Sequence, residues 1–160
     1  LLALPQGVQA MSADFPGLVQ TSLNLGVMAL EGDGLHFSYA VRSSVASQKA
    51  MLEQRVRSIV EHAGGRVDKR SEYPAWQYQR QSRLWDTVAG AYEAVYGRKG
   101  VIAGTHGGLE CGLLMEKFPG MDAVSLGPEL HDVHSPRERL NVPSTQRTYE
   151  LVCEVLRRSR

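Results

Sequence analysis

The densest run of residues able to carry chemistry is segment 129–138, which reads Glu-Leu-His-Asp-Val-His-Ser-Pro-Arg-Glu. It follows an apolar stretch and a Gly127-Pro128 break, and α/β folds place their sites in loops beyond the carboxyl ends of parallel strands. Imidazole and carboxylate groups together suit zinc, provided that two or three more ligands come from elsewhere. From these residues alone, a histidine-rich surface loop is at least as good an interpretation as a metal site.

A second cluster, Thr105–Gly112, places His106 and Glu110 on either side of the pair Gly107-Gly108. Glycines that lead into a helix expose backbone N–H groups, which can receive a substrate carboxylate. Glycine also permits close packing of a helix against a sheet, so packing is the alternative interpretation.

The elements that precede these clusters are predicted from apolar periodicity. Segments 17–30 and 35–41 alternate apolar and polar residues around a Gly-rich turn at 31–34, which predicts a β-hairpin. A helical stripe at 45–63 and a strand at 66–72 follow, so this part is predicted to be β-β-α-β, a half of an α+β sandwich.

Arg42 lies at the end of that hairpin, on the face opposite the apolar side chains. It is either a solvated arginine or a clamp for a carboxylate or carbonyl group. His36 and His62 are assigned no role.

The aromatic, proline-containing segment 73–81 predicts a boundary or hinge, and a different pattern follows it. Helices are predicted from about residue 82, at 106–117 and after a Ser144 cap; buried strands are predicted at 101–104 and 121–126. Strands that alternate with helices indicate a parallel sheet, so the second part is predicted to be α/β. Two short strands make a poor core, and the simplest explanation is that the rest of the sheet lies upstream of Leu1.

Composition excludes several classes of function. The net charge of +1 over 160 residues argues against a dedicated nucleic-acid partner, and no apolar run approaches the ~20 residues of a membrane span. Cys111 and Cys153 are expected to be buried free thiols in a reducing compartment, which predicts a cytoplasmic protein. The start, Leu1 to Pro5, has neither an initiator Met nor a charged leader and is interpreted as a cut into a longer chain.

Six motifs, in order along the chain, resemble the bacterial aminoacyl-histidine (Xaa-His) dipeptidases. They are Met11-Ser12, Pro16–Gly26, Val41-Arg42-Ser43-Ser44, Tyr73-Pro74-x-Trp76, Gly108–Gly112 and His134-Ser135-Pro136. The resemblance implies a zinc metallopeptidase related to the carnosinases, with two Zn2+ ions per complete site and Co2+ or Mn2+ as alternatives. Its substrates would be dipeptides such as β-alanyl-histidine, and a homodimer through the lid domain is a candidate assembly.

The family's architecture is an α/β catalytic domain interrupted by a smaller α+β lid. Residues 1–76 would then be the C-terminal part of the lid, and residues 77–160 the C-terminal segment of the catalytic domain. The histidine of the His-Ser-Pro motif ligates zinc in the family, which maps to His134, whereas His131 has no counterpart.

The resemblance also assigns substrate-binding positions. The lid arginine of the family maps to Arg42, and the glycine-rich turn that lines the substrate pocket maps to Gly108, Glu110 and His106. One departure is Arg137, which stands where the family usually has an acidic residue after His-Ser-Pro.

The family's other metal residues, a His-x-Asp pair, a Glu-Glu pair and a further Asp, lie in its N-terminal half. This sequence contains neither His-x-Asp nor Glu-Glu, so the general base is expected upstream of this chain and the 160-residue chain is predicted to be inactive by itself. Two alternatives stay open: a related two-zinc aminopeptidase or deacylase, and a truncated, non-enzymatic remnant.

Overall fold

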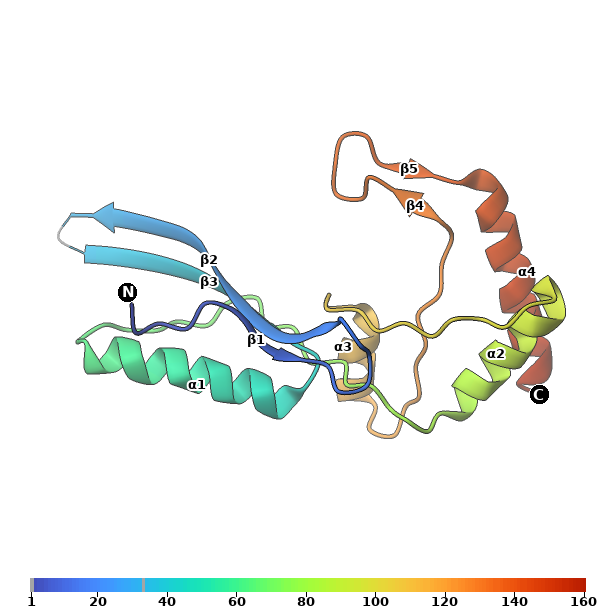
Figure 1. Cartoon of the computed structure of the whole chain (residues 1–160), viewed down its shortest axis with the longest axis horizontal. Coiled ribbons are helices and arrows are strands. Elements are labelled where there is room, and N and C mark those ends of the chain that lie inside the picture. Colours follow the sequence, from blue (N-terminus) through green and yellow to red (C-terminus); the bar gives the residue numbers. More distant parts are fainter. Residues whose placement is uncertain (1, 33) are drawn as a thin grey trace. The chain divides into compact units, whose positions relative to one another are not determined.

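The structure is a computed structural model that describes residues 2–32 and 34–160, so Leu1 and Asp33 of the predicted turn lie outside the described residues. The chain forms two compact units (Figure 1). The first comprises Leu1–Tyr78 and Ala103–Pro119, and the second comprises Gln79–Ile102 and Gly120–Arg160. The first unit thus includes a segment from beyond residue 77, and the division into lid and catalytic parts at that residue stays a prediction.

The sheet of the first unit has three antiparallel strands in the order β1-β2-β3. They are β1 (Gly7–Met11), β2 (Val19–Glu31) and β3 (Gly34–Ser43). The predicted hairpin is confirmed by β2 and β3, which pair from Thr21↔Ser43 to Glu31↔Gly34. Strand β1 was not predicted, because four of its five residues are exposed and no apolar alternation marks it.

A register shift between Leu25 and Val27 changes the far half of the hairpin. Before the shift, Leu23 opposes Val41 on the core face, as the period of two predicts. After it, Val27 opposes Ser38 and is 59% exposed. An uninterrupted period of two through Leu23, Leu25 and Val27 would place Val27 on the face of Leu23, but a β-bulge adds one residue and turns the following side chains over.

Helix α1 (Ala46–His62) covers the core face of this sheet, as Figure 1 shows. Its buried Leu52 and Val56 confirm the predicted stripe. They pack with two residues from elsewhere, Leu4 and Leu23. The helix ends where Gly64 adopts a left-handed φ of 82°, which glycine tolerates without a side-chain clash.

Two predicted strands, 66–72 and 101–104, are absent from the described residues. Segment 66–72 forms no ladder, because Val67 is its single apolar residue and charged residues fill most of the rest. Segment 101–104 forms no ladder either, and Val101 is 93% exposed. Helix α3 (Glu110–Lys117) begins four residues later than the predicted 106–117, because His106 to Leu109 remain a glycine-containing loop.

The second unit is built on α2 (Arg83–Tyr96) and α4 (Val142–Arg158), which pack against each other. Ser82 caps α2: its Oγ accepts from the Trp85 N–H and donates to the Asp122 carboxylate at 2.7 Å. The cap of α4 is Asn141 rather than the predicted Ser144, because the Asn141 side chain accepts the Ser144 N–H.

The predicted parallel sheet is not found among the described residues of the second unit. Its strands are the two-residue elements β4 (Leu130–His131) and β5 (Arg139–Leu140), which pair antiparallel. Segment 121–126 forms no ladder, because no neighbouring strand is present to accept its backbone hydrogen bonds. The apolar runs were identified correctly, but a strand also requires a partner.

Cys111 and Cys153 are free, as predicted, but only half buried. In the described part of the chain, none of the helices has the length and apolarity needed to cross a membrane.

Replacing Leu52 by Ala should destabilise the first unit by about 2–5 kcal/mol, because a side chain that is 1% exposed would leave a cavity between α1 and the sheet. The free energy of unfolding from urea denaturation, followed by far-UV circular dichroism, measures this effect. The control is Met51→Ala on the solvent face of α1, where the side chain is 58% exposed and the effect should stay within about 0.5 kcal/mol. Equal losses in the two variants would contradict the described core.

Candidate functional site

Three polar side chains of the first unit come together on the sheet face opposite α1. Ser22 on β2 is the direct cross-strand partner of Arg42 on β3. Directly opposite residues of an antiparallel pair have Cβ atoms about 5 Å apart, on the same face. The Ser22 Oγ also lies 2.7 Å from Nε2 of His106, a residue 84 positions further along the chain. The structure therefore places His106 beside the hairpin position predicted to bind substrate.

The environment of His106 favours the neutral imidazole. Burial lowers the pKa of His106 from its ordinary value of 6.5, and the charge of Arg42 lowers it further, while the Val19 backbone acts in the opposite direction. His106 Nδ1 is buried, and no hydrogen bond of acceptable geometry satisfies it within the described residues. Leaving a buried ring nitrogen without a hydrogen-bond partner is energetically unfavourable.

Arg42 is exposed, and no carboxylate among residues 2–32 and 34–160 forms an ion pair with its guanidinium group. An unpaired guanidinium beside a neutral imidazole can receive an anion through charge-assisted hydrogen bonds. The arrangement suits a carboxylate or a polarised carbonyl oxygen.

Gly108 and Glu110 lie next to Tyr73, from the Tyr-Pro-x-Trp segment. A Cβ atom at Gly108 would come within 2.6 Å of the Tyr73 ring, so the close approach of the loop to that ring requires glycine. Burial raises the pKa of Tyr73, and the neighbouring Glu110 and Cys111 raise it further. This contact supports the packing interpretation of Gly108.

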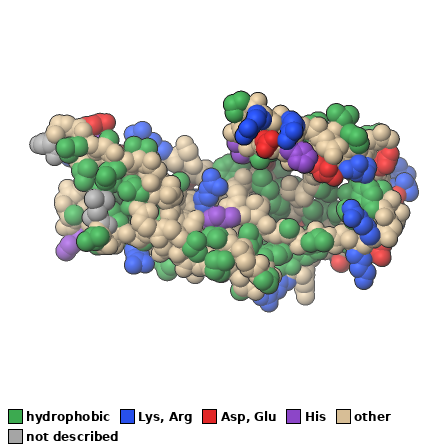
Figure 2. Space-filling model, turned by 45° about the horizontal axis from the view of Figure 1, so that its top comes forward, with side chains coloured by type: hydrophobic (Ala, Val, Ile, Leu, Met, Phe, Trp, Pro, Cys, Tyr) green, Lys and Arg blue, Asp and Glu red, His purple; other side chains and the backbone are tan. Residues whose placement is uncertain are grey.

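His134 belongs to the second unit, in the turn between β4 and β5. It is exposed and has a φ of 64°, a left-handed conformation that is uncommon for a residue with a side chain. Its backbone N–H donates to Glu138 Oε2 at 2.9 Å. Histidine and charged side chains of both signs gather on this hairpin (Figure 2).

The donor atoms present do not make a complete metal centre. Among the described residues, no group of three His, Cys, Asp or Glu side chains is placed to hold a metal ion. Zinc sites in enzymes use about three protein ligands, so His134 can contribute at most one of them. No catalytic step through a metal is therefore assigned to this chain's own residues.

Ser22 is the residue of this cluster to which the sequence analysis gave no role. Its position in β2 could have revealed it, because the hairpin register places Ser22 and Arg42 on one face.

A shallow hollow elsewhere, at the start of α2, contains none of the predicted site residues. Its lining residues are Arg80, Gln81, Ser82, Arg83, Trp85 and Asp86.

Comparison with known proteins finds similarity to peptidases. No protein-family model matches it. The cytosol non-specific dipeptidase of Escherichia coli (strain K12) is 32% identical over 157 residues, which cover 98% of this chain and 32% of that protein.

Two solved structures share the fold of the chain. The crystal structure of aminoacylhistidine dipeptidase from Vibrio alginolyticus matches with a TM-score of 0.83 and 35% identity over 97% of this chain and 32% of that one. The aminopeptidase PepT of Bacillus cereus matches with a TM-score of 0.72 at 18% identity, over 98% of this chain and 42% of that one, and is a likeness of fold.

The chain spans about one third of the length of both dipeptidases that it matches. It is a mixed α/β segment and a partial homologue of cytosol non-specific dipeptidase and aminoacylhistidine dipeptidase.

Proposed function

We infer that this chain is the C-terminal portion of a zinc-dependent dipeptidase that hydrolyses Xaa-His dipeptides such as β-alanyl-histidine. The observation that carries this inference is the convergence of Arg42, Ser22 and His106 in a chain homologous to two dipeptidases. By analogy with the name of the Escherichia coli relative, the proposed location is the cytoplasm.

The chain's own residues contribute substrate binding in this proposal. The Arg42 guanidinium pairs with a carboxylate or carbonyl oxygen of the dipeptide. His106, neutral because its pKa is lowered, can donate or accept a hydrogen bond without repelling Arg42. Gly108 lets the substrate backbone approach the loop before α3, and Glu110 stands beside it.

His134 would be a ligand of one metal ion, with the remaining ligands and the general base supplied from outside this chain. Zinc, when bound, polarises a carbonyl group and makes a water molecule a better nucleophile at neutral pH. Arg137 replaces the acidic residue usual in the family, but the carboxylate of the next residue, Glu138, accepts a hydrogen bond from the His134 backbone N–H. We propose that Glu138 takes over part of the missing acidic role.

The exposed apolar segments of the second unit support the same proposal. Val101 and Ile102 are 93% and 46% exposed, and the predicted strand that contains them has no ladder partner among the described residues. Met121 and Leu126 are also exposed in a segment without a ladder. In the proposed complete enzyme, further strands pair with these segments and satisfy their backbone groups.

A chimera tests the role of His134. This chain replaces the homologous third of the Escherichia coli dipeptidase, and hydrolysis of β-alanyl-histidine and other dipeptides is measured together with metal content. The chimera should be active, and the 160-residue chain alone inactive. His134→Ala should lower kcat/KM by more than the roughly 10–100-fold caused by losing an outer partner of a metal ligand, and should lower metal content.

The matched control is His62→Ala, an exposed histidine at the end of α1, which should retain full activity. Full turnover and metal content in His134→Ala would remove His134 from the site. Activity of the isolated chain, or a folded chimera without activity, would contradict the proposed function.

The electrostatic effect of Arg42 on His106 is tested by NMR titration of the histidine ring signals. The pKa of His106 should lie below 6.5, rise in Arg42→Ala and stay low in Arg42→Lys, because Arg42 favours the neutral ring. Because the pKa of His106 is lower in the folded protein than in the unfolded chain, its contribution to folding stability is present above pH 6.5. That contribution is lost as the pH falls below 6.5 through the pKa of the folded protein. Arg55→Ala, on the exposed side of α1, is the control. The same His106 pKa in the wild type and in all three variants would show that Arg42 does not influence the titration of His106.

We further propose a homodimer through the β2–β3 hairpin of the first unit. Val27, Met28 and Leu30 are more than half exposed there, and Figure 2 shows hydrophobic side chains on this part of the surface. Light scattering after size exclusion should give a dimer for the wild-type chain and a monomer for Leu30→Lys. Val101→Lys, at a still more exposed apolar position in the second unit, should leave the dimer intact. A monomeric wild-type chain would refute this assembly.

A further inference from the structure

The hairpin that carries His134 has almost no core of its own. Its two ladder pairs are Leu130↔Leu140 and His131↔Arg139, and both leucines are about half exposed. An isolated two-stranded ribbon is marginal in water even when it is much longer. The direction in which this hairpin presents His134 must therefore be set by what holds its neck, the residues just before β4 and just after β5.

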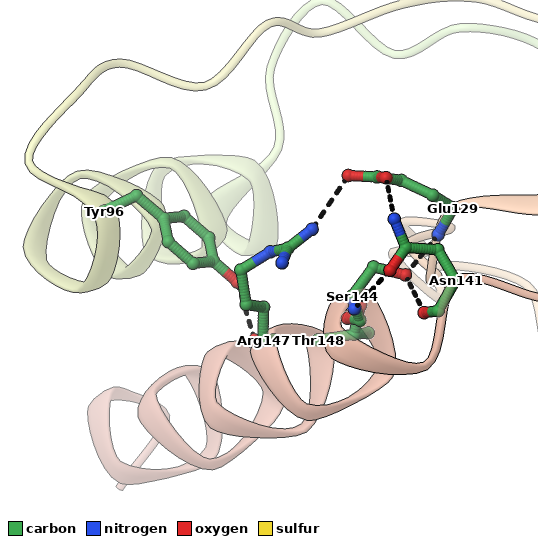
Figure 3. Close-up of polar contacts among 6 residues, drawn as sticks. All are labelled: Tyr96, Glu129, Asn141, Ser144, Arg147 and Thr148. Atoms are coloured by element: carbon green, nitrogen blue, oxygen red, sulfur yellow. Dashed lines mark hydrogen bonds and ion pairs between the residues drawn. The ribbon is translucent and has the colours of Figure 1, made fainter.

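The neck is held by the first turn of α4, through the buried hydroxyl group of Ser144. This residue is 3% exposed. Its Oγ accepts the backbone N–H of Glu129, which precedes β4, at 2.9 Å. The same Oγ donates to the backbone carbonyl of Asn141, which follows β5, at 2.6 Å. One side chain thus joins both strands of the hairpin to the helix (Figure 3).

The Glu129 carboxylate makes a second set of contacts at the same place. Its Oε2 accepts from Asn141 Nδ2 at 2.7 Å, and its Oε1 accepts from Arg147 Nη2 at 2.9 Å. Arg147 lies one turn further along α4, and its backbone carbonyl accepts from Tyr96 Oη at 2.6 Å. Figure 3 shows how these contacts connect α2, α4 and the neck of the hairpin.

The turn beyond the neck is strained, which makes its anchoring more consequential. Asp132 and His134 both have positive φ, at 52° and 64°. Arg139 pairs with Asp132 at 2.8 Å, and Glu138 accepts the His134 N–H. Residues with side chains keep such a conformation only when the surrounding contacts impose it.

We propose that Ser144 and Glu129 are positioning residues for His134. They lock the neck of the β4–β5 hairpin to the first turn of α4, and so they set the direction in which the imidazole is presented. The importance of that direction rests on the proposed function, in which His134 is a metal ligand. The hydrogen bonds that Ser144 and Glu129 make at the neck are properties of the described residues, and their effect on the hairpin can be tested without any metal.

The test uses backbone residual dipolar couplings of the 160-residue chain. In the wild type, residues 130–140 and helix α4 should fit a single alignment tensor. In the double variant Ser144→Ala, Glu129→Ala, α4 should still fit, because the Asn141 side-chain cap accepts from the backbone N–H of residue 144. The hairpin should no longer fit that tensor, and exchange of the backbone amide of residue 129 should accelerate about tenfold or more, because its N–H loses the Ser144 Oγ acceptor.

Thr148→Val is the matched control, because its hydroxyl group bonds within α4, to the Ser144 carbonyl, and does not contact the neck. Its hairpin should fit the α4 tensor as in the wild type. If the double variant unfolds the second unit, Glu129→Gln carries the comparison, since it retains one acceptor and loses the other.

A hairpin that still shares the α4 tensor in the tested variant would overturn the proposal. Turnover by the His134→Ala chimera would instead overturn the proposed function and leave the coupling data unaffected, so the two failures are distinguishable.

Discussion

The register of β2 against β3 is the constraint on which the first unit depends. It places Leu23 opposite Val41 on the face covered by α1, and Ser22 opposite Arg42 on the other face. A slip of one residue would exchange the two faces, so that the core and the polar cluster would be lost together. Because burial of Leu23 and Leu52 is strongly favourable, the core holds the register that the cluster requires.

His106 shows how that constraint reaches a distant segment. Its loop is anchored on the first unit by close contacts, among them Gly104 against Phe15 and Leu18, where a Cβ atom would come within 2.5 Å of a side-chain atom. Packing therefore brings the imidazole to Ser22, although no regular element contains it. The lowered pKa of His106 follows from this position, since burial and Arg42 act on the ring together.

The second unit solves a different problem, because its hairpin lacks a hydrophobic core. Polar contacts at the neck, with the buried Ser144 hydroxyl group at their centre, take the place of packing. Buried hydrogen bonds of this kind are directional, so they define an orientation that apolar contacts would leave less specific. The capping of α4 by Asn141 and the anchoring of the hairpin are thus parts of one network.

The sequence by itself determined the elements whose signals are local. The alternation that yields β2 and β3, the stripe that includes Leu52 and Val56, and the helices α2 and α4 were all predictable, because each depends on periodicity within one segment. Motifs also identified Arg42, His106, Gly108, Glu110 and His134 as candidates.

The tertiary structure decided the rest. Segments 101–104 and 121–126 have apolar patterns but no ladder, because a strand is defined by a partner that lies elsewhere in the chain or outside it. The bulge that exposes Val27, the contact between Ser22 and His106, and the role of Ser144 at the hairpin neck likewise depend on residues far apart in the sequence, whose proximity only folding establishes.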